Sequence, residues 1–134
     1  MPRLTRWALR LALLHLILGF SLGALMLCAK ASGACAWAWP LRGLHIELLT
    51  IGWTAQLALA VAYWILPRHV GGRRGPEAPA WAAWVLLNLG VWASGLTTAL
   101  VGPRLLLGIG HSAEALGILV FSVQLWPRVK AFGV

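Results

Sequence analysis

Four of the ionisable side chains that stand inside long apolar stretches of this sequence could bind a metal or cofactor: His15, His45, His111 and Glu114. An ionisable residue in an apolar span is costly, so it indicates a functional site. Imidazole is an axial ligand of haem iron, and a bis-histidine pair gives a low-spin haem for electron transfer. Mixed imidazole and carboxylate ligation with open positions suits non-haem iron or copper instead.

The haem interpretation takes His45 and His111 as the axial ligands. Haem propionates near a membrane surface need arginine partners, and arginine binds carboxylates well. Arg42 and Arg104 stand at the matching ends of the two runs that contain these histidines. Gly52, about two helical turns after His45, leaves space beside a flat ring. These five residues form the predicted binding site for haem b.

His15 and Glu114 are predicted to form a second polar site, for another haem, a metal or protons. A competing site binds non-haem iron or copper through His111 and Glu114, with His15 or His45 as the further ligand. Glu114 is alternatively a proton relay or a quinol partner beside His15. These alternatives stay open at the level of the sequence.

One stripe of the second run is expected to face the interior of the protein. At 3.6 residues per turn, His45, Gly52, Gln56 and Tyr63 fall along one side of a helix. Polar groups that face lipid are costly, so this side should face other helices. Glu47 falls nearly on the opposite face, close to the outer end, where its side chain is expected to reach water rather than pair with His45.

Small residues follow His15 at four-residue steps, Gly19 and then Gly23. This pattern predicts either close helix packing or room for a flat macrocycle. The third run lacks ionisable groups, and its polar residues are expected to form hydrogen bonds between helices. Those residues are Asn88, Ser94, Thr97 and Thr98.

Four apolar runs must position these groups, at about 7–29, 44–66, 80–101 and 105–126. Each has about 22 residues, enough at ~1.5 Å per residue to cross a hydrocarbon core of ~30 Å. The chain is 60% hydrophobic and 10% charged, whereas soluble domains carry about 25% charged residues. We therefore predict one all-α transmembrane domain over residues 1–134, an integral membrane four-helix bundle.

The basic residues are divided unevenly between the two sets of helix ends. The formal net charge is +8. One set of ends has Arg3, Arg6, Arg10, Arg68, Arg73, Arg74, Arg128 and Lys130, and the other has Lys30, Arg42 and Arg104. This positive-inside bias predicts that both termini face the cytoplasm (N-in/C-in) in a cell inner membrane. The charge is then expected to contact the lipid bilayer and not nucleic acid.

Cys28 and Cys35 fall at or beyond the outer end of the first run. On an oxidising side of the membrane, a disulfide between them would close the turn. The sequence does not determine whether their geometry allows it. Two thiols at this spacing are too few for a zinc or iron–sulfur site.

The second run also contains a recognisable motif. In order, its elements are Arg42, His45, Gly52-Trp53, Ala62-Tyr63 and Pro67-Arg68. Over about 27 residues this pattern resembles the second transmembrane helix of haem–copper oxidase catalytic subunits, and is most similar to the C-type oxidases and nitric oxide reductases. The resemblance implies that His45 ligates a low-spin haem b and that Arg42 binds its propionates. The last run does not match that family's His-x-His helix.

The same family has many more helices, and further histidines for a high-spin haem and copper. This chain has four histidines, so it is not a complete oxygen reductase. The resemblance implies a reduced relative that keeps the low-spin haem half. Along straight helices, His45 and His111 differ in depth by roughly 6–9 Å at ~1.5 Å per residue. Helix tilt absorbs part of this difference; otherwise another subunit supplies the partner of His45.

The predicted function is one-electron transfer or haem-linked sensing by a membrane protein with one or two b-type haems. The alternatives are an accessory or assembly subunit, and a small metal or haem carrier with a non-haem His/Glu site. Glycine-rich faces on the first and last helices favour a homodimer or association with other membrane redox proteins.

Overall fold

The computed structural model describes residues 1–68 and 74–129. Within these residues the chain is all-helical and contains no strand. Four helices are long and apolar enough to cross a membrane: Arg3–Ser32, Ala36–Ile65, Glu77–Ala99 and Arg104–Arg128. The predicted all-α, four-helix architecture is confirmed, and the first two helices extend beyond their apolar runs. His69, Arg73 and Lys130 lie outside the described residues.

Helix α1 (Arg3–Ser32) continues past the apolar run to a glycine cap. Gly33 has φ 71°, a left-handed conformation that glycine adopts without strain. Its N–H donates to Ala29 O at 2.9 Å and so satisfies a carbonyl at the helix end. Lys30, which follows the apolar run 7–29 directly, therefore belongs to helix α1.

The second span changes helix type three times. It consists of the 3₁₀ helix η1 (Ala36–Leu41), α2 (Arg42–Glu47), the π-helix η2 (Leu48–Ala55) and α3 (Gln56–Ile65). Backbone hydrogen bonds in a π-helix join residues five apart, and Thr54 Oγ1 likewise donates to Leu49 O at 2.8 Å. Such segments are rare and frequently occur at functional sites. Helix η2 begins directly after Glu47 and contains Gly52.

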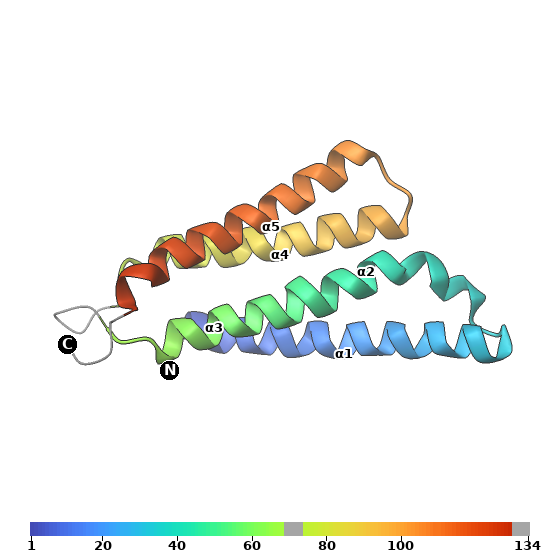
Figure 1. The fold of residues 1–134 in the computed structure, drawn as a ribbon, viewed down its shortest axis with the longest axis horizontal. Helices are drawn as coiled ribbons and strands as arrows, with labels where there is room; N and C mark the ends of the chain where they lie inside the picture. The colour runs from blue at the N-terminus through green and yellow to red at the C-terminus, as the bar shows by residue number, and fades with distance from the viewer. Residues whose placement is uncertain (69–73, 130–134) are drawn as a thin grey trace.

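Helices α4 (Glu77–Ala99) and α5 (Arg104–Leu125) form a close antiparallel pair, which their short connection favours (Figure 1). Glycines let the two backbones approach each other. A Cβ on Gly110 would lie 2.8 Å from Ser94 N. A larger side chain at this position would therefore separate the helices.

The chain consists of two hairpins packed against each other (Figure 1). In the first, η2 and α3 lie along α1; α2 also contacts α4 of the second hairpin. One buried apolar cluster contains Leu4, Tyr63, Ala80, Ala83, Phe121 and Leu125. A second, which includes residues of α2 and α4, contains Leu44, Leu48, Val91 and Ala99. Both clusters join residues of the two hairpins.

Arg128, in the 3₁₀ helix η3 (Trp126–Arg128), binds the end of α3. Its Nη2 donates to Tyr63 O at 2.8 Å and to Leu66 O at 2.7 Å, and its Nε donates to Pro67 O at 3.0 Å. Carbonyls at a helix C-terminus lack partners within the helix. The buried guanidinium supplies those partners and links the two hairpins.

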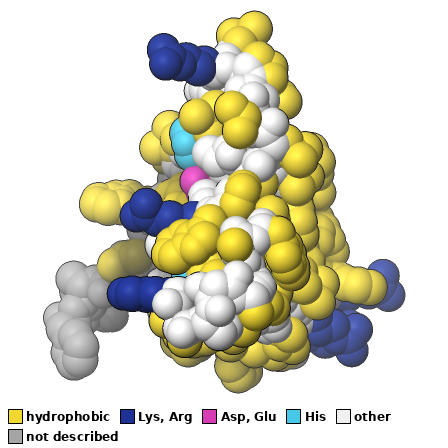
Figure 2. All heavy atoms as spheres, turned by 90° about the vertical axis from the view of Figure 1, so that its right-hand side faces the viewer, with side chains coloured by type: hydrophobic (Ala, Val, Ile, Leu, Met, Phe, Trp, Pro, Cys, Tyr) yellow, Lys and Arg dark blue, Asp and Glu magenta, His cyan; other side chains and the backbone are white. Residues whose placement is uncertain are grey.

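Apolar side chains cover the outside of the bundle. Figure 2 shows hydrophobic side chains around much of the visible end, with Lys and Arg at its margins. Every long helix exposes large apolar residues, among them Ile17, Leu27, Ile65, Leu89 and Leu119. Exposed apolar surface of this extent is unusual for a soluble monomer, and it is compatible with a multi-pass membrane protein.

Candidate metal and cofactor sites

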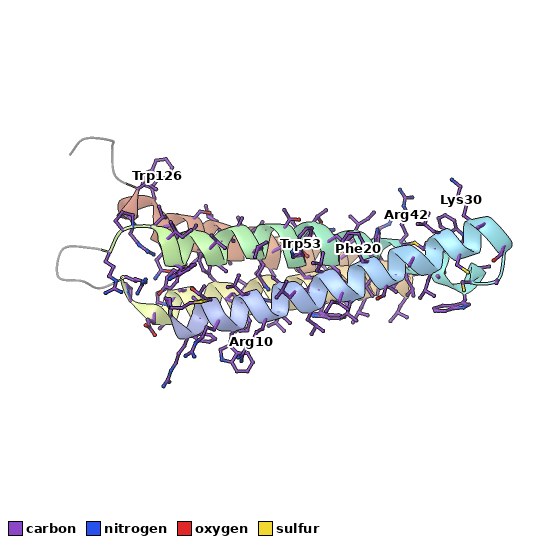
Figure 3. The ribbon with its side chains drawn as sticks, turned by 90° about the horizontal axis from the view of Figure 1, so that it is seen from below. Arg10, Phe20, Lys30, Arg42, Trp53 and Trp126 are labelled. Carbon is purple, nitrogen blue, oxygen red and sulfur yellow. The ribbon has the colours of Figure 1, made fainter. Side chains whose placement is uncertain are left out.

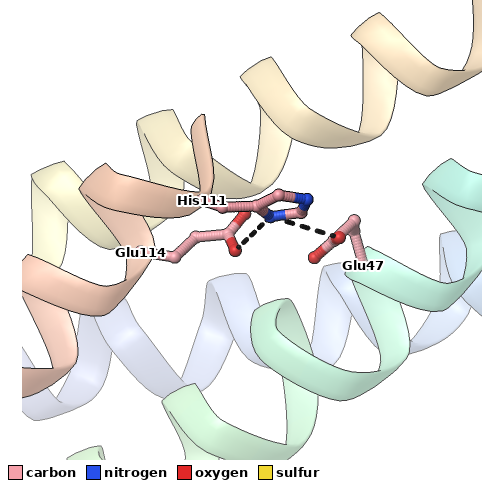
Figure 4. A group of neighbouring side chains, drawn as sticks. All are labelled: Glu47, His111 and Glu114. Carbon is pink, nitrogen blue, oxygen red and sulfur yellow. Dashed lines mark hydrogen bonds and ion pairs between the residues drawn. The ribbon is translucent and has the colours of Figure 1, made fainter. Parts of the chain in front are cut away.

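Glu47, His111 and Glu114 meet between the two hairpins (Figure 4). Glu47 is the last residue of α2, whereas His111 and Glu114 lie about one turn apart on α5. His111 Nδ1 lies 3.1 Å from Glu114 Oε2 and 3.8 Å from Glu47 Oε1. The three ligand atoms all lie within 4.8 Å of one another. One imidazole nitrogen and two carboxylates therefore converge.

Helix α4 holds the Glu114 carboxylate in place. Ser94 Oγ donates to Glu114 Oε1 at 2.6 Å, which leaves the other oxygen facing His111. Gly90 supplies the space for this side chain, because a Cβ there would lie 2.6 Å from Glu114 Cγ. Glu114 is 5% exposed. The carboxylate is thus buried, oriented and hydrogen-bonded.

Glu47 differs from its predicted surroundings. The prediction that it does not pair with His45 agrees with the structure, but the prediction that its side chain reaches water does not. Its side chain is 14% exposed and faces His111 of the other hairpin. Two residues along an α-helix correspond to a rotation of about 200°. Because His45 faces α1, Glu47 faces α5.

His15 and His45 join the two spans of the first hairpin. His15 Nδ1 donates to Gly52 O at 3.0 Å, and His45 Nδ1 donates to Gly19 O at 2.8 Å. A carbonyl oxygen can only accept, so Nδ1 carries the proton in each ring. In the neutral imidazole, Nε2 then keeps the lone pair. The Nε2 atom of His15 is buried without a hydrogen-bond partner in the described part of the chain.

Glycines make room for both histidines. A Cβ on Gly52 would lie 2.6 Å from His15 Nδ1, and one on Gly23 would lie 2.9 Å from His45 Cε1. Close packing, one of the two roles predicted for Gly19 and Gly23, is therefore observed. Gly52 faces the imidazole of His15 rather than an open slot.

The predicted inward stripe on the second span is observed for most of its length. His45 and Gly52 contact α1, and Gln56 donates to a carbonyl of α1 at 3.0 Å. Tyr63 packs instead against Phe121 of α5, with ring centroids 5.8 Å apart. The first three residues of the stripe therefore face α1, and the last one faces α5.

A groove of about 670 Å³ opens between α1 and α2. Its lining is mostly apolar and includes Phe20, Met26, Leu27 and Trp39. Three basic side chains also line it: Lys30, Arg42 and His45. Figure 3 shows the side chains of Lys30 and Arg42 extending to the same side of the bundle. The groove therefore combines an apolar surface with an imidazole and two cations.

The structure does not bring the two predicted axial ligands together. His45 faces α1 and lines the groove, whereas His111 faces Glu47. Arg104 is exposed at the start of α5 and does not line the groove. Lys30, which lies in the last turns of α1, lines the groove instead.

His15 and Glu114, the predicted second polar site, also have different neighbours. His15 contacts Gly52 and the ring of Trp92, whose centroid lies 5.8 Å away. Glu114 contacts Ser94 and His111. Among the described residues, the convergent group of potential metal ligands contains Glu114 but not His15.

The sequence did not indicate that Glu47 would lie beside His111 and Glu114, or that Ser94 would donate to Glu114. The chain has only three acidic residues, and two of them, Glu47 and Glu114, lie inside apolar runs. This rarity is the feature of the sequence that could have indicated a shared site. Of the four polar residues expected to join helices, Ser94 does so. Asn88, Thr97 and Thr98 donate to carbonyls of their own helix.

Cys28 and Cys35 are neighbours, as their spacing indicated. Their sulfurs lie 3.5 Å apart as free thiols, farther than the ~2.0 Å of a disulfide bond. The hydrogen bond to Cys28 raises the pKa of the Cys35 thiol, because donating the proton stabilises the neutral form.

Comparisons of the chain with protein-family models, with curated proteins and with solved structures found no match.

Proposed function

We propose that the chain is an integral membrane protein that binds one b-type haem in the groove between α1 and α2. His45 is the axial ligand, and Arg42 and Lys30 bind the propionates. The observation that carries the proposal is the groove, which combines an imidazole, two cations and an apolar lining. The distribution of basic residues favours an N-in/C-in orientation in the inner membrane.

The groove meets the chemical requirements of haem. The macrocycle needs apolar surface, its carboxylates need cations, and its iron needs a basic nitrogen. The bond from His45 Nδ1 to Gly19 O leaves Nε2 as that nitrogen and fixes the ring orientation, as in most metal-binding histidines. Ligand pockets are typically ~300–1,000 Å³, and the groove's volume of about 670 Å³ lies within that range.

Among the described residues that line the groove, His45 supplies the one imidazole, and His111 does not line it. A haem bound there would therefore have one proximal histidine. A haem with one proximal histidine can bind small ligands at its open position. We therefore propose haem-linked sensing. One-electron transfer by a bis-histidine haem would require an imidazole from a second copy.

Replacement of His45 by alanine is expected to abolish haem binding. Untagged protein in detergent would be supplied with haemin, and absorption spectra would be recorded for the oxidised, reduced and CO-treated forms. The wild type should take up one haem per chain, with a band that shifts on CO addition. His45→Ala should stay colourless because the axial nitrogen is lost.

The matched control is His111→Ala, because that imidazole lies outside the groove. It should bind haem with an unchanged spectrum. A wild-type protein that remains colourless after haem addition would refute the proposal. Loss of haem in His111→Ala with retention in His45→Ala would refute the ligand assignment.

Removing both groove cations should weaken haem binding without abolishing it. We expect the double variant Lys30→Gln/Arg42→Gln to bind haemin roughly tenfold more weakly, since exposed charge pairs contribute at most ~1 kcal/mol each. Fluorescence quenching of the tryptophans during haemin titration measures the affinity. Arg104→Gln, which neutralises a cation outside the groove, should bind like the wild type. An equal loss in Arg104→Gln would argue against this propionate assignment.

A further inference from the structure

We propose that Glu47, His111 and Glu114 form a separate site for one divalent first-row transition-metal ion. The three side chains come from both hairpins and converge within 4.8 Å. The site shares no residue with the groove that the haem proposal uses. It therefore goes beyond that proposal and can be tested independently of it.

The charge of the cluster favours a bound cation. The side chains of Glu47 and Glu114 are only 14% and 7% exposed, respectively, in a mostly apolar bundle. Within the described ranges, the ion pairs of both involve only His111, and no lysine or arginine takes part. Burying carboxylates without a counter-charge is very unfavourable. A divalent ion balances both carboxylates.

The distances are close to those of a metal site. Ligand atoms held at ~2.0–2.2 Å by one tetrahedral ion lie about 3.3 Å from each other. His111 Nδ1 lies 3.1 Å from Glu114 Oε2 and 3.8 Å from Glu47 Oε1. A small rotation of the Glu47 carboxylate completes the approach. Ser94 already orients Glu114 through its other oxygen, as residues around metal ligands commonly do.

The donor set indicates the class of ion. Imidazole suits Zn²⁺, Fe²⁺ and Ni²⁺, whereas Mg²⁺ and Ca²⁺ prefer oxygen ligands alone. The cluster contains no thiolate, the donor that selects Cu⁺. Three protein ligands leave a coordination position open, as in catalytic zinc sites. The His111 side chain is 49% exposed, so the cluster is not fully enclosed by the bundle.

The test is a Co²⁺ titration of the full, untagged chain in detergent after treatment with a chelator. We expect visible d–d absorption bands that saturate at one Co²⁺ per chain and disappear when Zn²⁺ is added. Glu47→Gln and Glu114→Gln should each lower the affinity at least tenfold, since each removes an anionic ligand. Glu77→Gln is the matched control, because Glu77 is the remaining acid and is exposed at the start of α4.

Thermal unfolding gives a second measurement that separates lost ligands from lost folding. Zn²⁺ should raise the melting temperature of the wild type and of Glu77→Gln, but not that of Glu47→Gln. Absence of saturable Co²⁺ binding in the wild type would overturn the proposal. So would equal affinity in the wild type, Glu47→Gln and Glu114→Gln. His45→Ala, which removes the proposed haem ligand, should bind Co²⁺ like the wild type. The metal-site proposal can therefore hold even if the haem proposal fails.

Discussion

Replacement of Gly90 by leucine is expected to separate α4 from α5 and to destabilise the protein by about 3 kcal/mol or more. A Cβ at this position would already lie 2.6 Å from Glu114 Cγ, 2.8 Å from Glu114 N and 2.8 Å from Gly110 O. Two of these are backbone atoms of α5, so rotation of a side chain does not relieve the contact. The helix must move, and Glu114 must move with it.

Unfolding by SDS in mixed micelles, followed by circular dichroism, measures this effect. Gly108→Leu is the matched control, because Gly108 is on α5 and a Cβ there meets nothing within 4 Å. It should unfold like the wild type. If Gly90→Leu is as stable as Gly108→Leu, the close contact between α4 and α5 is wrong.

Loss of the Arg128 guanidinium is expected to have the second-largest effect, about 3 kcal/mol, since one hydrogen bond to a charged group contributes ~1.5–3 kcal/mol. Arg128 is 1% exposed and donates to three carbonyls at the end of α3. It also lies over the Tyr63 ring, with Cζ 5.2 Å from the centroid. Arg128→Met keeps much of the volume but leaves those carbonyls without donors.

The same unfolding measurement applies to Arg128→Met. Arg128→Lys should restore part of the stability, because a positive charge near a helix C-terminus is favourable. Arg104→Met, at an exposed arginine, should have little effect. Equal stability of Arg128→Met and Arg104→Met would show that the observed hydrogen bonds do not hold the two hairpins together.

The helical architecture was predictable because it depends on local sequence. Four apolar runs of sufficient length indicate four helices, whatever their neighbours are. The inward face of the second span was also predictable, since helical periodicity places His45, Gly52 and Gln56 on one side. The spacing of Gly19 and Gly23 indicated close helix packing as one of two alternatives, and the structure shows that the second span is the partner.

The partners of these residues depend on how the helices are arranged, which periodicity does not determine. The periodicity of the second span predicts that Glu47 reaches water, but His111 Nδ1 lies 3.8 Å from its Oε1 on the other hairpin. Lys30 lines the groove because α1 continues to its cap at Gly33, beyond the end of the apolar run at residue 29. The predicted pairing of His45 with His111 failed to appear because the two imidazoles face different helices.

The contacts of Arg128 also bear on the order in which the protein is made. The arginine lies 61 residues after Pro67, whose carbonyl it binds. At ~5–20 residues per second, a ribosome needs roughly 3 to 12 seconds to synthesise that interval. During this time the carbonyls at the end of α3 lack the donors that Arg128 later supplies. A nascent chain released before Arg128 would contain the apolar part of every long helix described but would lack the residue that joins the two hairpins at this end.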